Sequence, residues 1–263
     1  VNIQEILSSN AKNMRRSAIR DLLSVANRPE VISFAGGFPN PTTFPVDELK
    51  EIMQEILDTE SISALQYGAT EGNVKLREQI AKRYNAQGLN ITKDNIMITT
   101  SSQQAIDLTT KVFIDPGDTI ICGLPSYLGA LQAFWSYQAK PVGVPKDEDL
   151  ELVIKTLIAT GKKPKFIYAI PDFQNPSGIT MNYQQRKEVI AVAKKYDLLI
   201  LEDSPYREIR FDGEAQPMMY SMDTDGRVIL FGTFSKTFVP GFRIGWVIAP
   251  VEIIDKLIVA KQS

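Results

Sequence analysis

The sequence predicts an α/β fold: a three-layer α/β/α sandwich around a mostly parallel sheet. From residue 96 onward, short apolar runs alternate with amphipathic segments of helical length, a pattern typical of strand–helix–strand units. The apolar runs are as short as buried strands and are too short for helices. The predicted strands are residues 96–99, 119–123, 141–144, 166–169, 198–202, 228–231 and 244–248.

Helices are expected before the first strand and between most of the strands. In the first 27 residues, Ile19, Leu22, Leu23 and Ala26 recur at helical spacing, which predicts one or two helices. Residues 33–45 are rich in glycine and proline and predict an ordered loop. The remaining predicted helices are residues 46–57, 74–85, 103–113, 128–137, 150–159 and 182–196.

Composition excludes several classes of function. The 263 residues carry a net charge of -2 with no basic stripe, which argues against nucleic-acid binding. No histidine is present, so histidine-based triads and histidine metal sites are ruled out, and no metal is expected. The one cysteine cannot form an internal disulfide, and no apolar stretch has the length of a membrane span. We therefore expect a cytoplasmic protein that binds neither nucleic acid nor membrane.

Residues just after the strands carry the candidate chemistry, because ligands of such folds bind beyond the carboxyl ends of the strands. Lys236 follows the run 228–231, with Thr233 and Ser235 beside it and Arg243 seven positions on. This set suits an aldehyde cofactor that carries a phosphate: the amine forms an imine, and the guanidinium and hydroxyls bind the phosphate. The alternative is a surface lysine in a turn.

Two further strand ends offer ligands for the ring of such a cofactor. Asp203 can pair with a protonated ring nitrogen, and Tyr206 can reach the lysine or a ring hydroxyl. Alternatively, Asp203 or Ser204 caps a helix. Asn175 lies in an Asn-Pro-Ser-Gly string after the run 166–169; it either bonds a ligand hydroxyl or belongs to a turn only.

The ends of the first two strands add candidates for phosphate and ring binding. Ser102 and Gln103 lie where a helix is expected to begin, and free backbone amides there favour a phosphate. Ser102 is otherwise a plain N-cap. Tyr127 follows the second strand and either stacks on a flat ring or fills the core.

Together and in this order, these segments resemble the fold-type I enzymes that use pyridoxal 5'-phosphate (PLP), within the class I/II aminotransferases. The branch that the chain resembles most includes the 2-aminoadipate, kynurenine and related broad-range aminotransferases. The resemblance covers nearly the whole chain, through residues 18–23, 31–39 and 65–68 and Gly72 to the Lys236 motif. It implies amino-acid and 2-oxo-acid substrates, 2-oxoglutarate as acceptor, and a homodimer with a shared active site.

The resemblance also implies a role for each matching residue. Lys236 forms the Schiff base and shuttles the substrate proton, Asp203 pairs with the pyridine nitrogen, and Tyr206 and Asn175 contact the ring hydroxyl oxygen. Tyr127 stacks on the ring. The residues implied to hold the phosphate are Ser102, Gln103, Thr233, Ser235 and Arg243, the substrate-side residues are Gly37 and Asn175, and Tyr67 is implied to reach the phosphate in the partner subunit.

The resemblance suggests three regions: an N-terminal helical arm with a substrate-side loop (1–45), a large PLP-binding domain (46–250) and the start of a helix (251–263). Members of the family continue into a smaller C-terminal domain, whose arginine binds the substrate α-carboxylate. No arginine follows Arg243, so we expect that domain to be missing or truncated in this chain.

The expected reaction is a ping-pong transamination in which Lys236 transfers the proton. Two alternatives remain open at this point. One is another PLP reaction on the same fold, such as a carbon–sulfur lyase or a decarboxylase. The other is the aminotransferase-like sensor domain of a transcription regulator, although residues 1–30 are too short and not basic enough for a winged helix.

Overall fold

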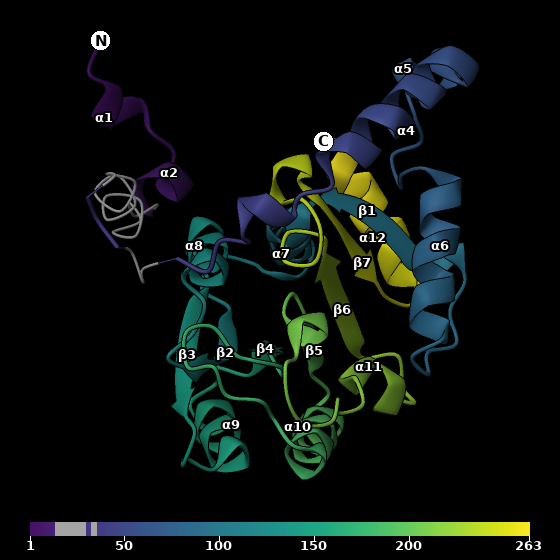
Figure 1. Ribbon diagram of the computed structural model, residues 1–263. Coiled ribbons are helices and arrows are strands. Elements are labelled where there is room, and N and C mark those ends of the chain that lie inside the picture. The colour runs from purple at the N-terminus through teal and green to yellow at the C-terminus, as the bar shows by residue number, and fades with distance from the viewer. Residues whose placement is uncertain (14–29, 33–35) are drawn as a thin grey trace.

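A seven-stranded sheet forms the centre of the protein in a computed structural model that describes residues 1–13, 30–32 and 36–263. Its strand order is β1-β7-β6-β5-β4-β2-β3 (Figure 1). The strands are β1 (Ile96–Thr100), β2 (Thr119–Leu124), β3 (Lys140–Pro145), β4 (Pro164–Ala169), β5 (Leu199–Asp203), β6 (Val228–Thr233) and β7 (Ile244–Ile248). All seven predicted strands are confirmed.

The sheet is mostly parallel, as predicted. Strands β2 to β6 pair in parallel, whereas β7 runs antiparallel to both β6 and β1. In the β5–β6 pair, Asp203 lies opposite Phe231, so the polar ends of these two strands leave the sheet side by side. The loops that carry the candidate residues therefore gather at one edge of the sheet.

Helices join the strands at nearly the predicted positions. Asn182 caps its helix by accepting from the Gln185 amide, and Asp149 and Asn73 cap two others in the same way. The helices are α1 (Ile3–Ile6), α2 (Ser9–Asn13), α4 (Val46–Thr59), α5 (Ser61–Leu65), α6 (Val74–Asn85), α7 (Ser101–Phe113), α8 (Leu128–Ser136), α9 (Leu150–Ala159), α10 (Tyr183–Tyr196), α11 (Met219–Met222) and α12 (Val251–Gln262), with short 3-10 turns η1 (Pro41–Thr43), η2 (Lys93–Asn95), η3 (Arg207–Ile209) and η4 (Pro240–Phe242). The helical spacing of Ile19 to Ala26 lies outside the described residues.

The two faces of the sheet bury different helices, which gives the predicted three layers. On one face, Ile120 and Phe166 pack with residues of α7, α8 and α12. On the other face, Ile121 and Ile167 pack with residues of α9, α10 and α11, and a third cluster joins α6 to Trp246 and its neighbours. Neighbouring strand residues point to opposite faces, so apolar runs without alternation mark strands that are buried on both sides.

One segment extends beyond this body. Figure 1 shows α4 and α5 reaching past the sheet, and the apolar residues of α4 (Ile52, Met53, Ile56 and Leu57) are 40 to 57% exposed. Among the described residues, no helix has the length and apolarity to span a bilayer. The division at residues 45 and 250 stays a prediction.

Candidate functional site

Lys236 lies three residues beyond the end of β6, where the loop brings it against an N-terminal segment. Its Nζ donates a hydrogen bond to the Gly37 carbonyl (3.0 Å) and lies 6.0 Å from the centre of the Tyr206 ring. Burial, with the positive charge of Arg243 in addition, lowers the pKa of the Lys236 amine. A lysine in this setting gives up its proton more readily than a surface lysine, so it can act as a nucleophile and a base.

Asp203, the last residue of β5, is a buried carboxylate with only one of its two oxygens bonded. Oδ2 accepts a hydrogen bond from the Tyr168 hydroxyl (2.7 Å), whereas the buried Oδ1 has no partner among the described residues. Burial raises the pKa of Asp203 to about 6, with the Tyr168 bond opposing the shift. An unpaired carboxylate oxygen here is suited to an N–H donor that carries positive charge, and a protonated pyridine nitrogen is such a donor.

Asn175 and Tyr206 come from different loops and meet beside this group. The Asn175 amide donates to the Tyr206 hydroxyl oxygen (3.1 Å), and burial raises the pKa of Tyr206. Asn175 follows β4 and Tyr206 follows β5. The amide of one and the hydroxyl of the other can each donate a hydrogen bond to an acceptor oxygen on a ring. The loop of Asn175 is a turn, and the Asn175 side chain also contacts Tyr206.

Tyr127 follows β2 and is half-buried. Its hydroxyl donates to Gln103 Oε1 (3.3 Å), and the Gln103 amide donates to the Gly129 carbonyl (2.8 Å). Burial, then the charge of Asp203, raises the pKa of Tyr127 to about 12, so the hydroxyl stays protonated. A Cβ on Gly129 would lie 2.5 Å from the ring, so glycine at this position lets the ring lie where it does.

The residues expected to hold a phosphate converge on the beginning of α7. Ser102 lies one residue inside the helix, which begins at Ser101, so it is not the N-cap. Ser101 has a φ of 65°, and a Cβ on Gly245 of β7 would lie 2.5 Å from the carbonyl carbon of Ser101 and 2.7 Å from the amide nitrogen of Ser102. The strand therefore packs directly against the helix start, whose first amides have no partner within the helix.

Hydroxyl and guanidinium groups complete this cradle. Thr233 Oγ1 lies 2.9 Å from Ser235 Oγ and accepts from the Ser235 amide, which fixes the turn that leads to Lys236. Arg243 is exposed and takes a left-handed backbone conformation with a φ of 54°. Its positive charge adds to the burial that lowers the pKa of Lys236 and opposes the burial that raises the pKa of Tyr127, as expected for a cation near both side chains.

Two of the predicted site residues differ from the others in their contact with the group, and the sequence did not predict one residue that belongs to it. Gly37 joins the group through its carbonyl, but Tyr67 is 99% exposed and takes no part in it within this chain. Tyr168, the partner of Asp203, was not predicted. The signal for it was a tyrosine in the otherwise apolar run 166–169, since a fully buried hydroxyl needs a hydrogen-bond partner.

Comparisons with known proteins agree with this arrangement. The family model described as aminotransferase class I and II matches residues 30–263. An aromatic-amino-acid aminotransferase of Thermococcus litoralis is 46% identical, with 99% of this chain and 64% of that protein covered.

Two solved aminotransferase structures have the same fold as this chain. A kynurenine aminotransferase of Pyrococcus horikoshii has a TM-score of 0.93 at 42% identity, over 99% of this chain and 66% of that one. An α-aminoadipate aminotransferase of Thermus thermophilus, complexed with N-(5'-phosphopyridoxyl)-L-leucine, has a TM-score of 0.88 at 34% identity, over 100% and 66%. The chain thus spans about two thirds of the length of the relatives that it matches.

Proposed function

Since the chain belongs to the class I and II aminotransferase family, we propose that the protein is a PLP-dependent aminotransferase. It would move an amino group between an L-amino acid and a 2-oxo acid by a ping-pong mechanism. One observation carries the proposal: two groups lie in one cluster of side chains at the same edge of the sheet. They are the oxygen of buried Asp203 that has no partner among the described residues and the Lys236 amine, whose pKa burial lowers.

The residues present fit the cofactor part by part. Asp203 Oδ1 would accept from the ring nitrogen, and Tyr206 and Asn175 would donate to the ring hydroxyl oxygen. Tyr127 would lie against the ring, and Lys236 Nζ is the amine that would hold the cofactor covalently. The groups that would hold the phosphate are those around the start of α7 and the Lys236 turn: Ser102, Gln103, Thr233, Ser235 and Arg243.

The chain's own residues then account for the proton transfer. When bound, PLP supplies an aldehyde for condensation with amines and a ring that accepts electrons from the substrate α-carbon. The Lys236 amine takes the α-proton and delivers it again, because its lowered pKa lets it give up a proton more readily than a surface lysine. A protonated ring nitrogen would keep Asp203 ionised, and the Asp203 carboxylate would in turn keep the proton on that nitrogen.

Glutamate formation tests the proposal and separates it from its rivals. The purified protein with PLP, a panel of L-amino acids and 2-oxoglutarate, the proposed acceptor, should produce glutamate and the matching 2-oxo acid. Release of ammonia and sulfide from cysteine, or of carbon dioxide, without glutamate would instead indicate a lyase or a decarboxylase. Absence of every turnover despite bound PLP would favour a sensor role.

A homodimer with a shared active site is the second part of the proposal. Two features support it: the exposed apolar side chains of α4, and a fully exposed Tyr67 that would reach the phosphate in the partner subunit. Two inactive variants, Tyr67→Ala and Lys236→Ala, should regain activity when their subunits are mixed, since one site of the hybrid carries neither change. No recovery upon confirmed subunit exchange would exclude a shared site.

We also propose the cytoplasm as the compartment. The single cysteine, Cys122, is free and buried in β2, as expected where thiols stay reduced. Fractionation of cells with an antibody to the protein would test this directly.

A further inference from the structure

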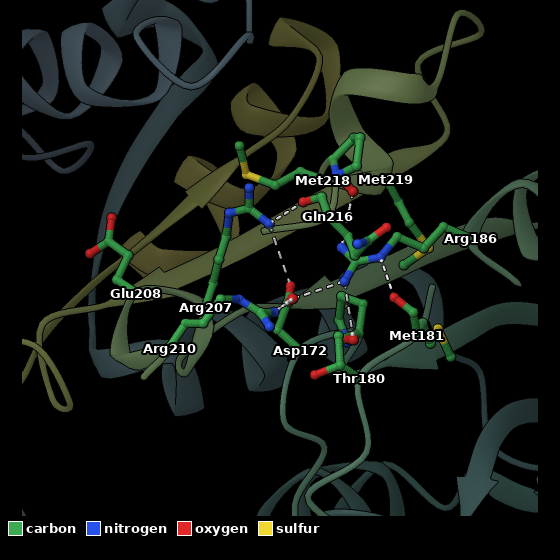
Figure 2. Close-up of polar contacts among 12 residues, drawn as sticks. Asp172, Thr180, Met181, Arg186, Arg207, Glu208, Arg210, Gln216, Met218 and Met219 are labelled. Carbon is green, nitrogen blue, oxygen red and sulfur yellow. Dashed lines mark hydrogen bonds and ion pairs between the residues drawn. The ribbon is translucent and has the colours of Figure 1, made fainter. Parts of the chain in front are cut away.

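A buried ionic cluster joins the two loops that carry Asn175 and Tyr206. Its centre is Asp172, which is fully buried and lies three residues before Asn175. Three guanidinium groups point at this one carboxylate (Figure 2). Arg186 and Arg210 lie 2.9 and 3.2 Å from Oδ1, and Arg207 lies 3.6 Å from Oδ2.

Arg186, in α10, fixes the base of the loop that carries Asn175. It is fully buried and also donates to the carbonyls of Pro171 (3.2 Å) and Met181 (3.0 Å). The Met181 amide donates back to the Pro171 carbonyl (2.8 Å). The two ends of the loop are therefore tied together, with Asp172 as the acidic partner of the arginine that ties them.

Arg207 and Arg210 bring the segment of Tyr206 to the same carboxylate. Arg207 follows Tyr206 directly and begins η3, and it also donates to the Gln216 carbonyl. Arg210 lies 4.6 Å from the centre of the Phe173 ring, next to Asp172 in the chain. Asp172 is thus the point at which the loop of Asn175 and the segment of Tyr206 meet.

We propose that Asp172 is a positioning residue that sets how Asn175 and Tyr206 are placed relative to each other. The two side chains are 31 positions apart and bonded at 3.1 Å, a geometry that both loops must hold together. The nearby acid Glu202 bonds the Met219 and Tyr220 amides, so it does not replace Asp172. This inference rests on the proposed function, in which Asn175 and Tyr206 both donate to the ring hydroxyl oxygen of PLP.

The visible absorbance of the PLP–lysine adduct reports this placement through its pH midpoint. Two donors to an ionised ring oxygen favour the deprotonated form and hold the midpoint low. Asp172→Asn should misplace them and raise the midpoint by about one pH unit, the size of one hydrogen bond to an ionised group. Loss of the Asp172 charge alone would act in the opposite direction, because the remaining guanidinium charges disfavour a protonated imine.

Glu151→Gln is the matched control. Glu151 is also a carboxylate that bonds several partners, Lys155, Lys195 and Tyr196, and it ties α9 to α10 without contact to either loop of the site. Its replacement should leave the midpoint unchanged. Arg210→Lys provides a second variant in case Asp172→Asn does not fold, since it keeps the charge but loses the planar fork; it should also raise the midpoint.

A double-variant background and a cofactor-free measurement complete the test. With Asn175→Ala and Tyr206→Phe already present, Asp172→Asn should no longer raise the midpoint. In the cofactor-free protein, the amides of Phe173 and Ser177 should exchange faster in Asp172→Asn than in the wild type. A midpoint that stays or falls in both Asp172→Asn and Arg210→Lys overturns the inference, whereas a wild-type protein without any visible absorbance overturns the proposed function itself.

Discussion

Replacing Asp203 with asparagine should stabilise the cofactor-free protein above neutral pH and at the same time weaken PLP binding. The carboxylate is 2% exposed, and within the described part of the chain only Tyr168 donates to it, so its charged form is poorly solvated. Asparagine has the same shape and can still accept from Tyr168, but it carries no charge. A residue that costs stability in the cofactor-free protein is expected where a ligand supplies the missing partner.

The pKa gives the size of the effect. Burial raises the pKa of Asp203 from 3.8 to about 6 in the folded protein. Between these values the folded state binds a proton that the unfolded state has lost, so the carboxylate destabilises the fold increasingly as pH rises through this window. At 1.36 kcal/mol per pKa unit the cost reaches about 3 kcal/mol above pH 6, of which about 1.4 kcal/mol develops between pH 5 and pH 8.

Urea unfolding of the cofactor-free wild type and Asp203→Asn at about pH 5 and about pH 8 measures this difference. The buried asparagine amide adds a cost of its own, but that cost does not depend on pH and cancels in the comparison. The advantage of the variant should grow by about 1.4 kcal/mol from the lower to the higher pH. An advantage that is equal at both pH values would refute the reasoning.

Glu202 offers the matched control for this experiment. It is the neighbouring residue in β5, and burial raises its pKa to about 7. Its two oxygens accept from the Met219 and Tyr220 amides, so both are already bonded. Glu202→Gln should therefore show a pH dependence of stability of the same sign, and a larger one of about 2.5 kcal/mol between pH 5 and pH 8, but retain PLP. Asp203→Asn should instead bind PLP more weakly.

Three further predictions concern the cofactor. Lys236→Ala should lose the visible absorbance and nearly all turnover in the transamination assay, and Lys236→Arg should do the same although it keeps the charge; normal turnover in either would contradict the role of the amine. Arg243→Gln should raise the Kd of PLP by about 10- to 100-fold, the value of a charge-assisted hydrogen bond, as measured by fluorescence titration. Gly245→Ala should weaken PLP binding and lower the midpoint of thermal unfolding, because its Cβ would lie 2.5 to 2.8 Å from backbone atoms at the start of α7. The control Gly241→Ala meets nothing within 4 Å and should be neutral.

Much of the fold and part of the site follow from local patterns. Apolar runs without alternation predicted the buried strands, because a strand with both faces covered has no polar side. Lys236, Asp203 and Asn175 could be placed together from the rule that parallel strands end at one edge of the sheet. These inferences need only the order and spacing of residues along the chain.

The ionic cluster and the backbone conformation at Ser101 and Arg243 could not be predicted in this way. Arg186, Arg207 and Arg210 are typical of surface residues in the sequence, and only folding brings them to Asp172. Ser101 and Arg243 have positive φ values although neither is glycine, so the residue type at these two positions does not predict the left-handed backbone conformation. Contacts between distant segments and strained local geometry are set by packing, which a pattern of residue types does not describe.

Reduction of the PLP-treated protein with borohydride, followed by mass spectrometry of its peptides, tests the central claim most directly. Borohydride makes the bond between PLP and a lysine permanent, so the modified residue can be read from the peptide masses. We expect the added mass at Lys236, in full yield, and none after prior treatment with hydroxylamine. Modification spread over several surface lysines, with Lys236 unmodified, would contradict the account.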